Sequence, residues 1–215
     1  MDLITLTDPR SPVSESYRTL RTNLSFSSLD RPLRTLVITS AAPEEGKSTT
    51  IANLAVTMAQ SGKKTILVDC DLRRPSLHTI FGLNAEPGLT NMLLDENSVS
   101  PLQNTQVENL YVLSSGAKPP NPADLLGSTK MDNVIERLME TADIILFDAP
   151  PVIAVTDAVV LGSKVDGVLL VVQAGKTRRD HAERAKEMLE KANVHIIGVT
   201  LTNAPNDSSI GGYYE

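Results

Sequence analysis

The sequence predicts a doubly wound α/β domain with a mostly parallel sheet, and its hydrophobic pattern carries this prediction. Apolar, β-rich runs recur along the chain: Thr35–Ser40, Thr65–Asp69, residues 109–113, Ile144–Asp148, Gly167–Gln173 and Ile196–Thr202. They are almost continuously apolar rather than alternating, which is typical of strands buried on both faces of a parallel sheet. Segments with helical spacing lie between them, so we expect ligands to bind at the carboxyl ends of the strands.

Length and composition fit one ordinary globular domain. The chain has 215 residues, of which 41% are hydrophobic and 21% charged, and this length can bury a sizeable core. The net charge of −6 argues against nucleic acid as a partner. The single cysteine, Cys70, cannot form an internal disulfide, which favours a reducing cytoplasm. The chain shows neither a run of about eighteen apolar residues nor a signal pattern, so we expect it to reach a membrane only through a partner.

We expect three segments along this single domain. Residues 1–34 form an N-terminal arm with a helix, and residues 35–205 form the main α/β domain. Residues 206–215 are polar and glycine-rich, which is typical of a flexible tail.

The first apolar run leads into a phosphate-binding loop. Residues 41–49 read Ala-Ala-Pro-Glu-Glu-Gly-Lys-Ser-Thr, which matches the P-loop pattern between a strand and a helix, with alanine where glycine is usual. Ala41 fits there if its φ is negative. We expect Gly46 to let the backbone close around the β-phosphate, Lys47 to neutralise the β/γ oxygens and Ser48 to ligate Mg²⁺. The remaining loop residues expected to contact the nucleotide are Ala42, Pro43, Glu44, Glu45 and Thr49.

Aspartates at the ends of two other runs are candidates for the same site. Asp148 ends an apolar strand, where P-loop proteins usually place a metal-side carboxylate. Asp69 and Asp71 are two residues apart, and in an extended strand such residues project to the same side. We therefore expect both to converge on one metal–phosphate centre, where a carboxylate can take a proton from a hydroxyl acceptor. The alternative is that one of the three caps a helix or pairs with Arg73 or Arg74.

With these residues placed, the sequence resembles the bacterial tyrosine kinases of capsular and exopolysaccharide biosynthesis. The resemblance covers nearly the whole chain. Three nucleotide-site motifs match in order and spacing: residues 41–48, residues 68–73 and Ile144–Asp148. The middle motif is the most discriminating, because related partition ATPases usually lack its Asp-x-Asp-x-Arg form. Residues 119–126, 148–151 and 156–158 are also similar to the family.

The resemblance implies an ATP- and Mg²⁺-dependent protein-tyrosine autokinase that regulates polysaccharide synthesis and export. It implies that Lys47 binds the β/γ-phosphates and that Ser48 and Asp148 organise Mg²⁺. Asp69 is the expected base for the tyrosine proton, and Asp71 is expected at the metal. The sequence leaves the roles of these two aspartates exchangeable. Asn203 is expected to contact the nucleotide base, as asparagine does in related proteins.

Two peripheral features sharpen the resemblance. Glu15, Arg18 and Arg21 fit the family's Glu-x-x-Arg-x-x-Arg motif, which in the family contributes to a ring-shaped oligomer, commonly an octamer. A solvated charged helix face is the alternative reading of this motif. Tyr213 and Tyr214 lie side by side near the C-terminus, which suits autophosphorylation in trans. Family tails usually hold a longer tyrosine cluster, so either fewer sites are used or the sequence ends early.

The resemblance also implies partners and a location. It implies a separate transmembrane activator of the polysaccharide co-polymerase type and a cognate tyrosine phosphatase. The chain would then be cytoplasmic and peripheral at the inner face of the membrane.

Two other functions compete with the kinase. A partition or septum-positioning ATPase shares the fold, but most such proteins carry an additional lysine early in the P-loop, and residues 41–45 have none. A non-catalytic ATP-binding scaffold is disfavoured by the complete set of Lys47, Ser48 and three aspartates.

Overall fold

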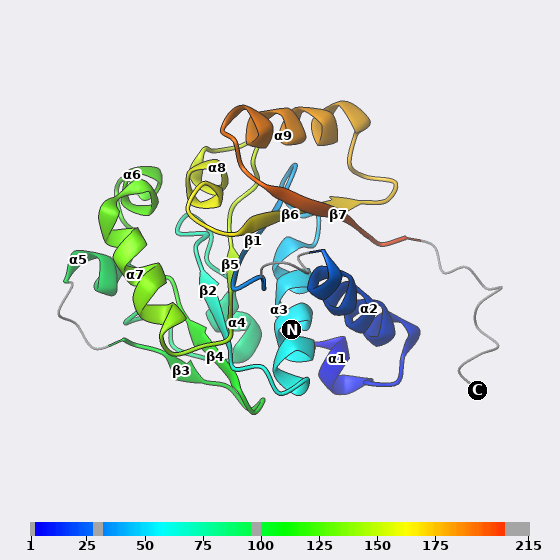
Figure 1. Ribbon diagram of the computed structural model, residues 1–215, viewed down its shortest axis with the longest axis horizontal. Helices are drawn as coiled ribbons and strands as arrows, with labels where there is room; N and C mark the ends of the chain where they lie inside the picture. Colours follow the sequence, from blue (N-terminus) through cyan, green and yellow to red (C-terminus); the bar gives the residue numbers. More distant parts are fainter. Residues whose placement is uncertain (1–2, 28–31, 96–99, 205–215) are drawn as a thin grey trace.

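The computed structural model describes residues 3–27, 32–95 and 100–204. Its centre is a seven-stranded sheet of order β3-β4-β2-β5-β1-β6-β7 (Figure 1). The strands are β1 (Thr35–Ser40), β2 (Thr65–Asp69), β3 (Gln103–Asn104), β4 (Leu110–Leu113), β5 (Ile144–Asp148), β6 (Gly167–Gln173) and β7 (Ile196–Thr202). The β3–β4 pair is antiparallel, and the other pairs are parallel. The doubly wound, mostly parallel sheet expected from the sequence is confirmed.

Helices cover both faces of the sheet. They are α1 (Ile4–Thr7), α2 (Pro12–Phe26), α3 (Lys47–Gln60), α4 (Leu77–Phe81), α5 (Leu89–Leu94), α6 (Pro122–Gly127), α7 (Thr129–Met139), α8 (Asp157–Gly162) and α9 (Arg179–Lys191). One apolar core joins the sheet to α1–α4 and the other joins it to α5–α9. Strands β1, β2 and β5 are buried along their whole length, because both of their faces carry apolar side chains that these helices cover. None of the helices in the described ranges is long and apolar enough to cross a lipid bilayer.

The order of the central strands brings the expected site together. β5 lies between β2 and β1, and the register of β2 and β5 places Asp69 directly opposite Asp148. β1 runs into the P-loop, and α3 begins at Lys47 on the far side of that loop. The carboxyl ends of these parallel strands therefore meet at one edge of the sheet, as the sequence predicts.

The N-terminal segment packs onto the P-loop helix. Thr5 donates hydrogen bonds from its amide and its hydroxyl to Asn53 on α3, at 3.1 and 2.8 Å. Arg21 on α2 donates to the carbonyl oxygen of Thr57, near the C-terminal end of α3, at 2.8 Å. The described part of the expected arm therefore shares a core with α3. The expected tail, with Tyr213 and Tyr214, lies outside the described residues.

Candidate nucleotide site

The P-loop closes around a glycine in a left-handed conformation. Gly46 has φ +87°, and a Cβ there would meet the side chain of Thr202 at 3.5 Å. Side chains rarely adopt this backbone region, so glycine is required at this turn. Positive φ among the described non-glycine residues is confined to Glu44, Asn109, Asn193 and Asn203. Ala41 is not among them, so its φ is not positive and alanine fits the first position of the loop.

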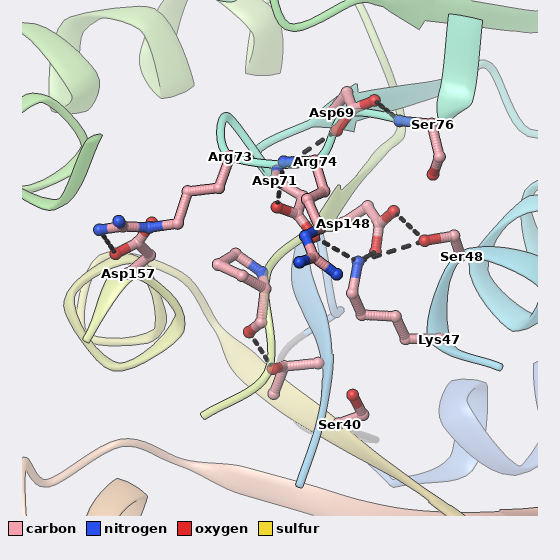
Figure 2. A network of polar contacts seen from close by, with 12 residues as sticks. Ser40, Lys47, Ser48, Asp69, Asp71, Arg73, Arg74, Ser76, Asp148 and Asp157 are labelled. Atoms are coloured by element: carbon pink, nitrogen blue, oxygen red, sulfur yellow. Dashed lines mark hydrogen bonds and ion pairs between the residues drawn. The ribbon is translucent and has the colours of Figure 1, made fainter. Parts of the chain in front are cut away.

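Lys47 lies at the centre of a polar cluster (Figure 2). Its ammonium group is 3.0 Å from Asp71 Oδ2 and 3.1 Å from Asp148 Oδ1. The Ser48 hydroxyl donates to Asp148 Oδ2 at 2.6 Å and accepts from Lys47 at 3.2 Å. One cation, two carboxylates and a hydroxyl from three different elements thus meet at the carboxyl edge of the sheet.

Burial and ion pairing act against each other in this cluster. Burial favours the neutral amine of Lys47, but the carboxylates of Asp148 and Asp71 outweigh it and raise the lysine pKa. Burial raises the pKa of Asp148, although Lys47 and Ser48 both stabilise its ionised form. The lysine therefore stays positively charged at neutral pH and complements the negative charge of phosphate oxygens.

Asp69 faces the N-terminus of α4, where the loop that follows β2 ends. Its Oδ2 accepts hydrogen bonds from the amides of Ser76 and Leu77, each at 2.9 Å. Its side chain is fully buried. Burial, with the nearby charge of Asp148, raises its pKa to about 7 despite these two amides and Lys47. Asp69 is thus a carboxyl group whose protonation changes near neutral pH, as a general base requires.

The two aspartates of the Asp-x-Asp pair occupy different surroundings. Asp71 reaches Lys47, whereas the oxygens of Asp69 meet backbone amides. The strand ends at Asp69, so the two-residue alternation of an extended strand does not carry on to Asp71. Neither aspartate pairs with the Arg73 guanidinium, which binds Asp157 through two hydrogen bonds of 2.9 and 3.0 Å. The Arg74 amide donates to Asp71 Oδ1 at 3.0 Å, which fixes that carboxylate from its second side.

Glu45, expected among the nucleotide contacts, turns its side chain inward. The side chain is buried, and Oε2 accepts from the amide of Ala42 at 2.9 Å. Oε1 accepts from the hydroxyl of Thr177 at 2.5 Å, and the Glu45 carbonyl oxygen accepts from Thr202 at 2.9 Å. The sequence analysis did not identify Thr177 and Thr202 as partners of Glu45, or Asp157 as the partner of Arg73. They belong to no phosphate-binding pattern, and folding alone brings them close.

The chemistry of the cluster suits Mg²⁺ with a nucleoside triphosphate. Ser48, Asp71 and Asp148 offer hard oxygen donors, which Mg²⁺ prefers. Within the described ranges, no three or more His, Cys, Asp or Glu side chains gather closely enough to hold a metal by themselves. Mg²⁺ commonly keeps waters and takes phosphate oxygens beside one or two carboxylates. The donor set therefore fits a metal that is shared with a nucleotide.

The chain is similar to known P-loop NTPases and tyrosine kinases. Residues 33–204 match a ParA-type family model described as NUBPL iron-transfer P-loop NTPase. The tyrosine-protein kinase YwqD of Bacillus subtilis is 45% identical over 99% of this chain and 91% of its own. The putative tyrosine-protein kinase CapB of Staphylococcus aureus is 39% identical over 96% of this chain and 91% of its own. The kinase domain of the Escherichia coli tyrosine kinase ETK superposes with a TM-score of 0.91 at 31% identity, covering 97% of this chain and 82% of that domain.

The septum-positioning ATPases are more distant. The cell division ATPase MinD of Pyrococcus furiosus has a TM-score of 0.67 at 29% identity and covers 81% of this chain and 74% of its own. Both kinds of protein share the fold, but the kinases match more of the chain and match it more closely. The comparison favours the kinase over the septum-positioning ATPase.

Proposed function

Because this chain belongs to the bacterial tyrosine kinases, a family of ParA-type P-loop NTPases, we propose that it is an autokinase whose acceptors are Tyr213 and Tyr214. In this proposal it binds Mg-ATP and transfers the γ-phosphoryl group to the tail of a neighbouring subunit. The observation that supports the proposal most is that the Lys47 ammonium group lies 3.0–3.2 Å from Asp71, Asp148 and Ser48. Phosphoryl transfer depends chiefly on positioning and charge stabilisation, and this cluster offers both.

The residues of the cluster bind either the phosphates or the metal in the proposed reaction. Lys47 leaves its carboxylate partners and neutralises the β/γ-phosphate oxygens. Ser48, Asp148 and Asp71 would hold Mg²⁺, which would further neutralise the phosphate charge. The amides around Gly46 and the N-terminus of α3 cradle the phosphates. Asn203, which follows β7 at the same edge of the sheet, contacts the base.

Asp69 is the proposed base for the tyrosine proton. Its pKa of about 7 matches the operating pH of a general base better than an ordinary carboxylate does. Asp71 contacts Lys47 directly, which suits a residue on the phosphate and metal side. Asp69 is buried, so in this proposal a tyrosine hydroxyl reaches it only after the loop between β2 and α4 shifts. Catalytic contacts commonly tighten in this way once substrate is bound.

The proposed setting is polysaccharide synthesis at a membrane. A separate transmembrane activator of the polysaccharide co-polymerase type recruits the chain to the inner face of the membrane and stimulates it. The subunits form a ring through Glu15, Arg18 and Arg21, and a cognate tyrosine phosphatase reverses the modification. The membership of the chain in the bacterial tyrosine kinases supports this setting.

One assay tests the proposed function. The purified chain is incubated with Mg-ATP and the cytoplasmic tail of a candidate activator, and phosphate is mapped by mass spectrometry. Phosphotyrosine at Tyr213 or Tyr214 that is lost in Lys47→Met is the expected result. ATP hydrolysis without phosphotyrosine would instead favour the partition or septum-positioning ATPase. The absence of both activities would favour the non-catalytic ATP-binding scaffold.

A further inference from the structure

Two threonine hydroxyl groups from outside the phosphate-binding motif donate hydrogen bonds to the P-loop. We call Glu45, Thr177 and Thr202 the P-loop brace. Thr177, in the loop between β6 and α9, donates its hydroxyl to Glu45 Oε1 at 2.5 Å. Thr202, at the end of β7, donates to the Glu45 carbonyl oxygen at 2.9 Å. Two elements that lie far along the chain therefore meet on one residue of the P-loop.

The hydrogen bond from Thr177 has a fixed direction. The backbone amide of Gln173 donates to the Thr177 hydroxyl oxygen at 2.8 Å. A hydroxyl carries a single proton, and the Thr177 proton is therefore left for the Glu45 carboxylate. Serine could keep this arrangement, whereas valine has the shape of threonine but no proton to give.

Glu45 depends on these neutral donors. Its side chain is 1% exposed, and within the described ranges no lysine or arginine forms an ion pair with it. Its other oxygen accepts from the Ala42 amide at 2.9 Å, across the mouth of the loop. A buried carboxylate that loses one donor must find another, because an unpaired buried charge is costly. Loss of the Thr177 hydroxyl would therefore pull on the Ala42 amide and alter the spacing of the loop.

We propose that Thr177 is a positioning residue for the phosphate cradle, acting through the carboxylate of Glu45. This inference rests on the proposed function to the extent that the P-loop binds nucleotide. A second hydrogen bond joins the same two loops, because the ammonium group of Lys176 donates to the Glu44 carbonyl oxygen at 2.8 Å. Glu44 adopts a left-handed φ of 60°, a conformation that such ties help to hold. The loop between β6 and α9 thus helps to set the shape of the P-loop, although none of its own residues belongs to the phosphate-binding motif.

The test compares Thr177→Val with Thr177→Ser in the full chain. Affinity for a fluorescent ADP analogue with Mg²⁺ is measured at equilibrium, beside the melting temperature and the KM and kcat for Mg-ATP. We expect Thr177→Val to weaken nucleotide binding and raise KM by about tenfold, the scale of a lost hydrogen bond to a charged group, with a smaller change in kcat. Thr177→Ser should stay within about twofold of the parent chain, since it keeps the donor.

The control is Thr141→Val, an exposed threonine before β5, at the opposite edge of the sheet from the P-loop. It should bind nucleotide as the parent chain does. If Thr177→Val does not fold, Thr177→Ala takes its place in the comparison with Thr177→Ser. Unchanged affinity in the folded valine or alanine variant, or an equal loss in the serine variant, would overturn the proposal. A parent chain that binds the ADP analogue but phosphorylates no tyrosine would contradict the proposed function and not the brace.

Discussion

The ammonium group of Lys47 lies 3.0 Å from the carboxylate of Asp71, although the two residues come from different elements. Asp148 approaches the same ammonium group at 3.1 Å. In the proposed reaction Lys47 meets the phosphates, while both carboxylates meet the metal. In that reaction nucleotide binding exchanges the internal ion-pair cluster for contacts with the ligand. The ion pairs match the buried charges within the protein itself.

Lys47→Met should abolish phosphotransfer and also destabilise the fold. The methionine leaves the buried Asp148 and Asp71 without their cation, and removing one partner of a buried ion pair costs about 3–5 kcal/mol. Chemical denaturation at neutral pH measures this cost. Lys186→Met is the control, because Lys186 pairs with Glu190 at 3.5 Å on the exposed face of α9, and it should change neither property. A Lys47→Met chain as stable as its parent would contradict the ion-pair account.

Asp69 should make stability depend on pH. Its pKa is about 7 in the folded chain against an ordinary value of 3.8, so the folded state binds the proton more tightly than the unfolded state. Its contribution to stability is therefore present at low pH and is lost as the pH rises from about 4 to about 7. Asp69→Asn should become more stable relative to its parent across this window, and the difference should level off above it.

The same substitution should remove the proposed base. We expect kcat/KM of the parent chain to rise with a midpoint near pH 7, the folded pKa of Asp69, and to fall at least about 100-fold in Asp69→Asn. Glu140→Gln, an exposed change at the end of α7, is the control. It should alter neither the pH dependence of stability nor the pH dependence of kcat/KM. If Asp69→Asn transfers phosphate normally while Asp71→Asn does not, the base is Asp71 instead.

Much of the architecture could be predicted because it depends on local pattern. Continuous apolar runs mark β1, β2 and β5, whose residues are all buried. β3 could not be found in this way, since it consists of two polar residues that pair antiparallel with β4. Its position depends on the partner strand rather than on its own hydrophobicity.

The identity of the site residues followed from motif spacing, but their contacts did not. The loop after β2 turns back so that the amides of Ser76 and Leu77 meet Asp69, and no local rule fixes that path. The Glu45–Thr177 bond joins residues 132 positions apart. Such pairs become visible only when folding has placed β6 and α9 beside the P-loop.

Arg73→Ala should reduce stability through a carboxylate that lies outside the nucleotide cluster. Asp157 is fully buried, whereas the Arg73 side chain is 40% exposed. Because solvent screens this ion pair, we expect Arg73→Ala to lower the free energy of unfolding by about 1–3 kcal/mol, less than for a fully buried pair. The exposed pair of Arg178 and Asp180 supplies the control, and Arg178→Ala should give no measurable change in thermal denaturation. Adding Asp157→Asn to Arg73→Ala should recover part of the loss; an additive loss would exclude the coupling.

Arg18→Ala combined with Arg21→Ala should shift the oligomer toward monomer in light scattering. Within the chain, Arg18 pairs with Glu15 at 2.6 Å, and Arg21 binds the Thr57 carbonyl oxygen. Arg21 also supports α3, so a modest loss of melting temperature is expected besides the change in mass. Arg184→Ala, on the exposed side of α9, should alter neither property. An unchanged mass in the double variant would exclude these residues from the ring contact.

A mixing experiment tests the proposed transfer most directly. One chain carries Lys47→Met and keeps both tail tyrosines, while the other keeps Lys47 and carries Tyr213→Phe with Tyr214→Phe. Each chain is incubated with Mg-ATP and the activator tail, alone and then mixed, and phosphotyrosine is mapped by mass spectrometry. The account predicts phosphate on Tyr213 or Tyr214 of the Lys47→Met chain in the mixture only. If the unmutated chain is active but Tyr213 and Tyr214 stay unmodified in the mixture, transfer between subunits is contradicted.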